Sequence, residues 1–369
     1  MRIAMISTPF VPVPPKGYGG TELIVHELTE GLLDAGHQVE LFSTGDSHTS
    51  GRLHHLYPVA QWPMDRLQDL NHVSWAMRLV QREGFDLVHI HSAEALACSR
   101  LLPDLPVVYT VHHVREALLS DYYKYFPEVH FVTISQDQRG RETPLFRGTT
   151  IHHGLSPGTY EWRDEPSDYV AFLGRFTEIK GLHTAIDATA LAGVPIEVGG
   201  EIHSVDALYG EREVKPRLAL PHVTYLGTVG IDRKVPLLRD ARAVLFPIEW
   251  NEPFGLVLIE AMLSGSPPIA FPRGSVPELV EDGVTGFVVQ DMGEMVELLK
   301  PGSRLDAFDR ARCRERAVDR FSAEQMVREH EKYYRTATRF AASQPAVGAK
   351  ELPSPPGTRS VAGRTAPSR

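Results

Sequence analysis

The stretch "RIAMISTPFVPVPPKGYGGTELIVHELTEGLLDAGHQVELFS", residues 2–43, decides the fold class. Its first seven residues form an apolar run typical of a buried strand. The segment "TELIVHELTEGLLDAG" has the apolar spacing of an amphipathic helix that ends at Gly36. "QVELFS" predicts the next strand. A strand, a helix and a strand in this order indicate a parallel sheet that is covered by helices.

The same alternation continues along the chain in two series. The first series adds strands at "DLVHIHS", "LPVVYTVHH", "VHFVTIS" and "TTIHHG", with helices over 65–83 and 93–102. The second series has strands at "YVAFLGR", "PIEVGG", "HVTYLG", "AVLFP", "PPIAF" and "GFVVQ", with helices over 178–192, 203–220, 232–240, 255–265 and 291–300. A polar, Pro-containing segment separates the two. We therefore predict an α/β protein with two doubly wound, Rossmann-like domains, over 1–160 and 161–320.

The C-terminal part differs in composition from the two domains. The segment "SAEQMVREHEKYYRTATRFAA" predicts a last helix, over 321–342, with Ser322 in the N-cap position. Residues 343–369 are rich in Pro, Gly, Ser and Ala, which is typical of a disordered tail.

Composition excludes several classes of protein. The chain has 369 residues, 42% hydrophobic and 23% charged, with a net charge of -9, so we expect no nucleic-acid partner. Cys98 and Cys313 are the only cysteines, which argues against disulfides and cysteine metal sites and fits a cytoplasmic protein. No apolar run reaches about 18 residues, so membrane contact would be peripheral at most.

The first candidate site is the loop "GYGGTE", residues 17–22, between the first strand and its helix. Ligands of doubly wound sheets lie at the carboxyl ends of strands. Adjacent glycines at a helix N-terminus, here Gly19 and Gly20, let backbone amides approach an anion closely. A flexible loop capped by Thr21 explains this stretch equally well.

A second candidate follows the first strand of the second domain. In "FLGRFTEIKG", Arg175 and Lys180 lie five residues apart in the loop between strand and helix. Arg binds phosphate through two parallel bonds and Lys binds it as a point charge, so the pair could hold a diphosphate. Two solvated surface cations are the alternative.

The third candidate is "NEPFGLVLIEAM", residues 251–262. The helix beginning here would offer free amides at Phe254, Gly255 and Leu256 to an anion. Glu252 lies beside this terminus, and Glu260 lies on a helix too apolar to leave it much solvent. Because sugar hydroxyls are good donors to carboxylates, the two glutamates could bracket a nucleotide sugar. Alternatively, Glu252 complements the helix dipole and Glu260 pairs with a cation.

The fourth candidate is "VVYTVHH", in which His112 and His113 end a strand of the first domain. A histidine facing an interdomain cleft could hydrogen-bond a substrate or transfer a proton. On spacing alone, a structural role explains either residue as well. The other histidine pairs lack a supporting carboxylate at fixed spacing, and the chain has no D-x-D triplet, so we expect no metal.

Taken in order, these motifs resemble the retaining glycosyltransferases of family 4, which have the two-domain GT-B fold. The resemblance covers about residues 1–340 and depends on the E-x7-E element in "EPFGLVLIEAM", on "GRFTEIKG" and on "GSVPELVEDGVTGFVV". "PPKGYGGTE" and "ISQDQR" look like a bacterial branch. The resemblance implies two Rossmann-like domains facing a central cleft and a last helix that crosses back to the first domain.

It further implies transfer of a hexose from a nucleotide diphosphate sugar, UDP-glucose by default, to an acceptor hydroxyl, with retention and without metal or cofactor. Arg175 and Lys180 would bind the phosphates, Glu260 the ribose, Glu252 and His112 the donor sugar as the catalytic pair, and Gly19 and Gly20 would approach phosphate and sugar. Since no carboxylate is an assured nucleophile, we expect front-face attack by the acceptor.

Two other functions remain open from the sequence. A nucleotide-sugar epimerase can share the architecture, and a catalytically silent nucleotide-sugar-binding protein would keep the same charged residues. The chain also departs from the family pattern at His153 and Glu201. The acceptor would meet the first domain, where the helix over 65–83 and "REALLSDYYKYFP" could face a sugar, a lipid head group or a small molecule.

Overall fold

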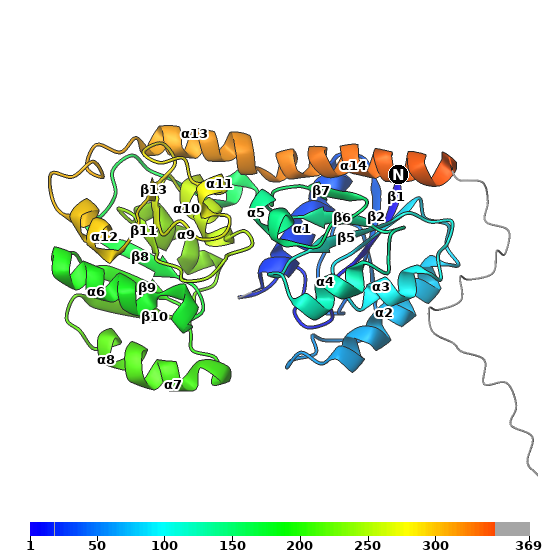
Figure 1. The fold of residues 1–369 in the computed structure, drawn as a ribbon, viewed down its shortest axis with the longest axis horizontal. Coiled ribbons are helices and arrows are strands. Elements are labelled where there is room, and N and C mark those ends of the chain that lie inside the picture. Colours follow the sequence, from blue (N-terminus) through cyan, green and yellow to red (C-terminus); the bar gives the residue numbers. More distant parts are fainter. Residues whose placement is uncertain (18, 344–369) are drawn as a thin grey trace, which may run out of the picture.

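The computed structural model describes residues 1–17 and 19–343, which contain two parallel sheets side by side (Figure 1). The tail predicted for 343–369 lies, beyond Ser343, outside the described residues. The first sheet has the order β3-β2-β1-β4-β5-β6-β7. Its strands are β1 (Arg2–Ile6), β2 (Gln38–Ser43), β3 (Arg52–His55), β4 (Leu87–Ile90), β5 (Val107–Val111), β6 (His130–Thr133) and β7 (Gly148–Thr150).

The second sheet has the order β10-β9-β8-β11-β12-β13. Its strands are β8 (Val170–Leu173), β9 (Ile196–Gly199), β10 (Val223–Gly227), β11 (Val244–Phe246), β12 (Pro268–Ala270) and β13 (Phe287–Val288). All pairings in both sheets are parallel. The predicted pair of doubly wound sheets is thus confirmed, although β3 was not predicted.

Helices cover both sheets. Those of the first are α1 (Gly20–Asp34), α2 (Arg66–Val80), α3 (Ala95–Ser99), α4 (Ala117–Tyr123) and α5 (Gln136–Arg141). Those of the second are α6 (Leu182–Ala192), α7 (Ala207–Tyr209), α8 (Lys215–Leu218), α9 (Ile231–Asp240), α10 (Leu256–Leu263), α11 (Val276–Leu279) and α12 (Met292–Leu299). The expected α6, α9, α10 and α12 are present. Helix α6 begins later than expected because Glu178–Lys180 form a separate 3-10 turn that ends at Gly181, with φ 72°.

The segment 203–220 is not one continuous helix. A π-helical stretch, Gly210–Val214, separates α7 from α8. Pro216 follows this stretch, and its ring removes the amide that a regular helix would bond to the carbonyl of Arg212. A wider turn accommodates such a loss.

Two C-terminal helices run along one side of both domains (Figure 1). Helix α13 (Arg310–Phe321) lies over the second domain, and α14 (Ala323–Ser343) continues over the first. The Ser322 hydroxyl accepts from the amide of Gln325, as expected for an N-cap. A Cβ on Gly31 would lie 2.6 Å from Val327, so glycine permits the close approach of α1 and α14. The predicted crossing helix is present.

A carboxylate joins the two sheet regions. Glu278 of α11 accepts hydrogen bonds from the amides of Gln136 and Asp137, at 2.8–3.2 Å, at the start of α5. His152 contacts the same carboxylate at 2.5 Å, and together these contacts hold the pKa of Glu278 below its usual value despite burial. Glu278 thus acts as an anion at the N-terminus of a helix in the other domain. Within the described residues, no helix is long and apolar enough to span a membrane.

Candidate functional site

The candidate residues lie where the strand order of each sheet reverses. In the first sheet this point is between β1 and β4, and in the second between β8 and β11. The segments between these strands and the next helices, together with the first residue of α1, carry Gly19 and Gly20, His91, Arg175 and Lys180, and Glu252. In open α/β sheets such reversals leave a crevice outside the carboxyl ends of the strands, where ligands bind.

The N-terminus of α10 is the centre of the arrangement. Gly255 precedes the helix in the left-handed region, with φ 85°. Among the described residues, the amides of Phe254 and Gly255 have no hydrogen-bond acceptor. A Cβ on Gly20 would lie only 3.2 Å from Cδ1 of Leu256, so the start of α1 lies against the start of α10. Two helix N-termini, one from each domain, therefore meet, which favours an anion between them.

Helix α1 begins one residue earlier than the proposed Thr21 cap. Gly19 occupies the N-cap position without a side-chain cap. A Cβ there would lie 2.8 Å from Pro15 and 3.0 Å from Val11, so the packing favours glycine. The proposed threonine cap is thus wrong.

Glu252 and Lys180 form an ion pair. The Lys180 ammonium donates to Oε2 of Glu252, and the Trp250 indole donates to the same oxygen at 3.0 Å. Glu252 is buried, at 7% exposure. The ammonium also lies 5.0 Å from the Trp250 ring, within cation–π distance. An anion that approaches Lys180 would have to share the donors of this ammonium with Glu252.

Glu260 is more deeply buried than Glu252 and has two partners. Its Oε1 accepts from the Tyr160 hydroxyl at 3.0 Å and from the Lys234 ammonium at 2.5 Å. Its Oε2 has no hydrogen-bond partner among the described residues. The expected burial of Glu260 is confirmed. The alternative interpretation, in which Glu260 pairs with a cation, is also confirmed, because Lys234 is that cation. One oxygen remains available for a ligand hydroxyl.

Arg175 is paired with a different carboxylate from that of Lys180. Its Nε is buried without a hydrogen bond and lies 3.9 Å from Oδ2 of Asp206, which also lacks one. At that distance the contact is an ion pair rather than a hydrogen bond. The guanidinium therefore keeps unused donors at the end of β8.

Hydrogen bonding fixes the tautomer of His112. His91 Nε2 lies 3.1 Å from Sδ of Met5, and His91 Nδ1 lies 2.8 Å from Nε2 of His112. A thioether can only accept, so His91 carries its proton on Nε2. Nδ1 of neutral His91 then accepts from Nε2–H of His112. This leaves Nδ1 of His112 as an acceptor, without a hydrogen-bond partner among the described residues.

Burial keeps these imidazoles neutral. Burial, helped by neighbouring histidines, lowers the pKa of His112 to about 3 and holds the pKa values of His91 and His153 well below 6.5. The His153 ring stacks on His112 at 5.3 Å and lies 4.9 Å from the Phe254 ring. His153 thus connects the end of β5 to the start of α10, which the sequence alone did not suggest.

His113 turns away from this group. Its Nδ1 lies 2.8 Å from the Val114 carbonyl oxygen, and its Nε2 lies 2.8 Å from the Tyr123 hydroxyl. The donor–acceptor pattern makes Nδ1–H the donor and Nε2 the acceptor of the tyrosine proton. Of the two strand-end histidines, His113 therefore has the structural role.

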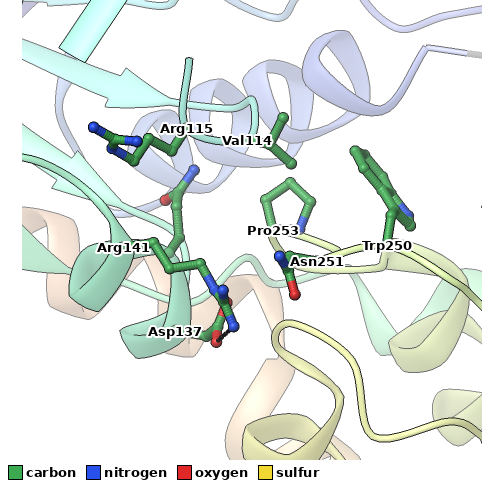
Figure 2. Close-up of a pocket in the computed structure, with 8 residues that line it drawn as sticks. Val114, Arg115, Asp137, Arg141, Trp250, Asn251 and Pro253 are labelled. Carbon is green, nitrogen blue, oxygen red and sulfur yellow. Dashed lines mark hydrogen bonds and ion pairs between the residues drawn. The ribbon is translucent and has the colours of Figure 1, made fainter. Parts of the chain in front are cut away.

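A hollow of about 290 Å³ lies beside Glu252, between the two domains. Figure 2 shows the loop with Trp250, Asn251 and Pro253 on one side of it and Val114 on the other. Arg141, also in the lining, is neutralised by a bidentate pair with Asp137, at 2.7 and 2.9 Å. Both domains therefore contribute walls beside the Lys180–Glu252 pair.

Sequence reasoning missed Lys234, Tyr160, Trp250 and His91. Spacing offered no signal for Lys234, because it lies 26 residues before its partner Glu260. Glu201, which departs from the family pattern, accepts from the Thr228 hydroxyl at 3.0 Å. Within residues 1–17 and 19–343, no group of three His, Cys, Asp or Glu side chains is arranged to hold a metal ion.

Two family models match the chain, one for each domain. The model described as Glycosyltransferase Family 4 matches residues 18–147, and the model described as Glycosyl transferases group 1 matches residues 161–300. An uncharacterized glycosyltransferase of Methanocaldococcus jannaschii is 22% identical over 78% of this chain and 85% of its own.

Solved structures share the architecture. A glycosyltransferase involved in avilamycin A biosynthesis superposes with a TM-score of 0.73 at 22% identity, covering 92% of this chain and 98% of its own. HepE of Anabaena, solved with UDP-glucose, gives a TM-score of 0.71 at 18% identity, covering 91% of this chain and all of its own.

Proposed function

Because this chain belongs to glycosyltransferase family 4 and has the GT-B fold, we propose that it transfers a hexose from a nucleotide diphosphate sugar to an acceptor hydroxyl, with retention and without a metal. The observation that carries this proposal is the meeting of the α1 and α10 N-termini beside the Lys180–Glu252 pair. That arrangement concentrates anion-binding groups at one point.

The proposed roles follow from the hydrogen-bond donors and acceptors of the site that remain available to a ligand. The diphosphate would accept from the amides of Phe254 and Gly255 and from Lys180 and Arg175. Glu260 Oε2 would accept from a ribose hydroxyl. The donor sugar would then lie toward Glu252, close to Gly19 and Gly20. UDP-glucose is the default donor, since the similar HepE was solved with it.

The chemistry requires charge stabilisation more than a protein acid. When the glycosidic bond breaks, negative charge grows on the diphosphate and positive charge on the anomeric carbon. Lys180, Arg175 and the helix amides stabilise the departing diphosphate. The acceptor hydroxyl attacks from the same face and its proton passes to the phosphate oxygen. Neutral His112 accepts a hydrogen bond from the sugar through Nδ1 and orients it.

A thermal-shift panel tests the proposal. UDP-glucose, GDP-mannose, ADP-glucose and the three nucleoside diphosphates are added to purified protein, with and without EDTA. Ligand at 100-fold its Kd adds about 2.7 kcal/mol to the free energy of unfolding. We expect a selective rise in Tm for the UDP ligands that persists in EDTA. No rise with any ligand, or a rise that needs a divalent ion, would refute the proposal.

A further inference from the structure

A second cavity lies wholly in the first domain, beside His112. Its volume is about 340 Å³, and it is lined by the start of α2, the loop between β4 and α3, the end of β5 and the start of α4. The residues proposed to bind the donor phosphates and ribose, Arg175, Lys180 and Glu260, are not in its lining. A cavity of this size accommodates a small molecule.

Asp69 is the polar residue that marks this cavity as a site. It is 4% exposed, and its Oδ2 accepts from the Ser92 hydroxyl at 2.7 Å. Its Oδ1 is buried without a hydrogen-bond partner in the part of the chain that the structure describes. Buried carboxylate oxygens are nearly always paired, so a missing donor points to a ligand that supplies it.

The charge of the lining selects the ligand. Three carboxyl groups, on Asp69, Glu94 and Glu116, face one cation, Arg66. The Arg66 side chain is 88% exposed and lies 3.5 Å from Glu94. Burial, and after it the neighbouring Glu94, raise the pKa of Asp69 to about 7. The contribution of Glu94 is a repulsion between carboxylates, which a ligand cation would relieve and a ligand anion would increase. Tyr109 and Leu119 add apolar surface to the lining.

We propose that this cavity binds the acceptor, and that the bound part of the acceptor is a polyhydroxylated group with no phosphate or carboxylate, whose affinity increases when it carries an amino group. This inference rests on the proposed function, which requires an acceptor next to His112. Asp69 accepts a hydroxyl or ammonium proton of the acceptor through Oδ1. Glu116, at the exposed rim, adds attraction for a cation.

Ligand-detected NMR titration with three matched probes tests this inference: methyl glucoside, its 2-amino-2-deoxy analogue and methyl glucuronide, each in the presence of saturating UDP. We expect the amino sugar to bind about tenfold tighter than the glucoside, and the glucuronide to bind weakest. Asp69→Asn should weaken the amino sugar about tenfold, whereas the exposed Asp104→Asn should leave it unchanged.

A rim variant provides a second readout that does not disturb buried groups. Glu116→Lys should reverse the order of amino sugar and glucuronide. Failure of the amino sugar to bind wild type, or equal binding of the glucuronide, would overturn the inference. UDP binding separates the two proposals: wild type that binds the amino sugar but no UDP contradicts the proposed function alone, and wild type that binds UDP but none of the probes contradicts the acceptor site alone.

Discussion

The Lys180 ammonium and the Glu252 carboxylate are paired although they lie 72 residues apart, on loops that follow β8 and β11. Each would be a costly isolated charge in this half-buried place. Pairing places both charges within reach of one ligand. The proposed diphosphate therefore competes with Glu252 for the same ammonium.

This competition gives Glu252→Gln a characteristic signature. Removing the carboxylate frees Lys180 for the diphosphate, so UDP should bind about fivefold tighter, equivalent to ~1 kcal/mol. Turnover of UDP-glucose should nevertheless fall about 100-fold, because the donor sugar loses the carboxylate that orients it by accepting hydrogen bonds. Calorimetric titration and the rate of UDP release measure the two effects.

Glu249→Gln is the matched control. Glu249 lies nearby in sequence, but its side chain is half-exposed, and its ion-pair partner, Arg273, is 3.9 Å away. This variant should leave both quantities unchanged. Weaker UDP binding in Glu252→Gln would show that the carboxylate supports the phosphate site rather than competing with it.

Glu260→Gln tests the ribose contact. Wild type should prefer UDP over at least one of 2′-deoxy-UDP and 3′-deoxy-UDP by about 1.5–3 kcal/mol, the range of hydrogen bonds to a charged group. In the variant this preference should shrink to less than about threefold. Titration of the three ligands into both proteins measures it. An undiminished preference in folded Glu260→Gln would assign the ribose to other residues.

Met5→Leu tests the proton arrangement around His112. Without the thioether acceptor, His91 is free to move its proton to Nδ1, which would force the proton of His112 onto its own Nδ1. We expect kcat to fall about tenfold while UDP affinity stays constant, because general acid–base and orienting groups raise reaction rates by at least about tenfold. Histidine ¹⁵N NMR shows the tautomer directly. The control is Met295→Leu, since Met295 is buried in the second domain. An unchanged His112 tautomer in Met5→Leu would contradict the proposed protonation of His91 and His112.

The buried histidines predict a stability loss in mild acid. Burial lowers the pKa of His330 to about 4, from an unfolded value near 6.5. Below pH 6.5 the unfolded chain takes up a proton that the folded chain does not, so stability falls with pH down to about 4. The slope is at most ~1.4 kcal/mol per pH unit for this residue. His330→Gln should flatten the curve of unfolding free energy between pH 6.5 and 4, whereas the exposed His48→Gln should not.

Much of the fold could be predicted because apolar periodicity and turn residues report it locally. The strand, helix and strand of residues 2–43 appear as β1, α1 and β2. By contrast, β3 could not be predicted, since "RLHH" lacks an apolar run and pairs as an edge strand beside β2. Edge strands need little apolar character, so composition does not reveal them.

The sequence predicted several residues of the candidate site, but it did not predict which side chains they contact. Strand ends and a helix start indicate Lys180, His112 and Glu252, and the apolar run 256–263 indicates that Glu260 is a buried carboxylate. Their partners depend on tertiary packing that spacing does not encode. Lys234 reaches Glu260 from a neighbouring helix, and His153 reaches His112 from the segment after β7.

Calorimetric titration of UDP, in EDTA, into wild type and into the Arg175→Gln/Lys180→Gln double variant tests metal-independent binding of the diphosphate. We expect wild type to bind UDP without a metal and the double variant to bind at least about 100-fold more weakly, because two charge-assisted contacts to the diphosphate are lost. Equal affinities in the two proteins, or wild-type binding only after a divalent ion is restored, would contradict this expectation.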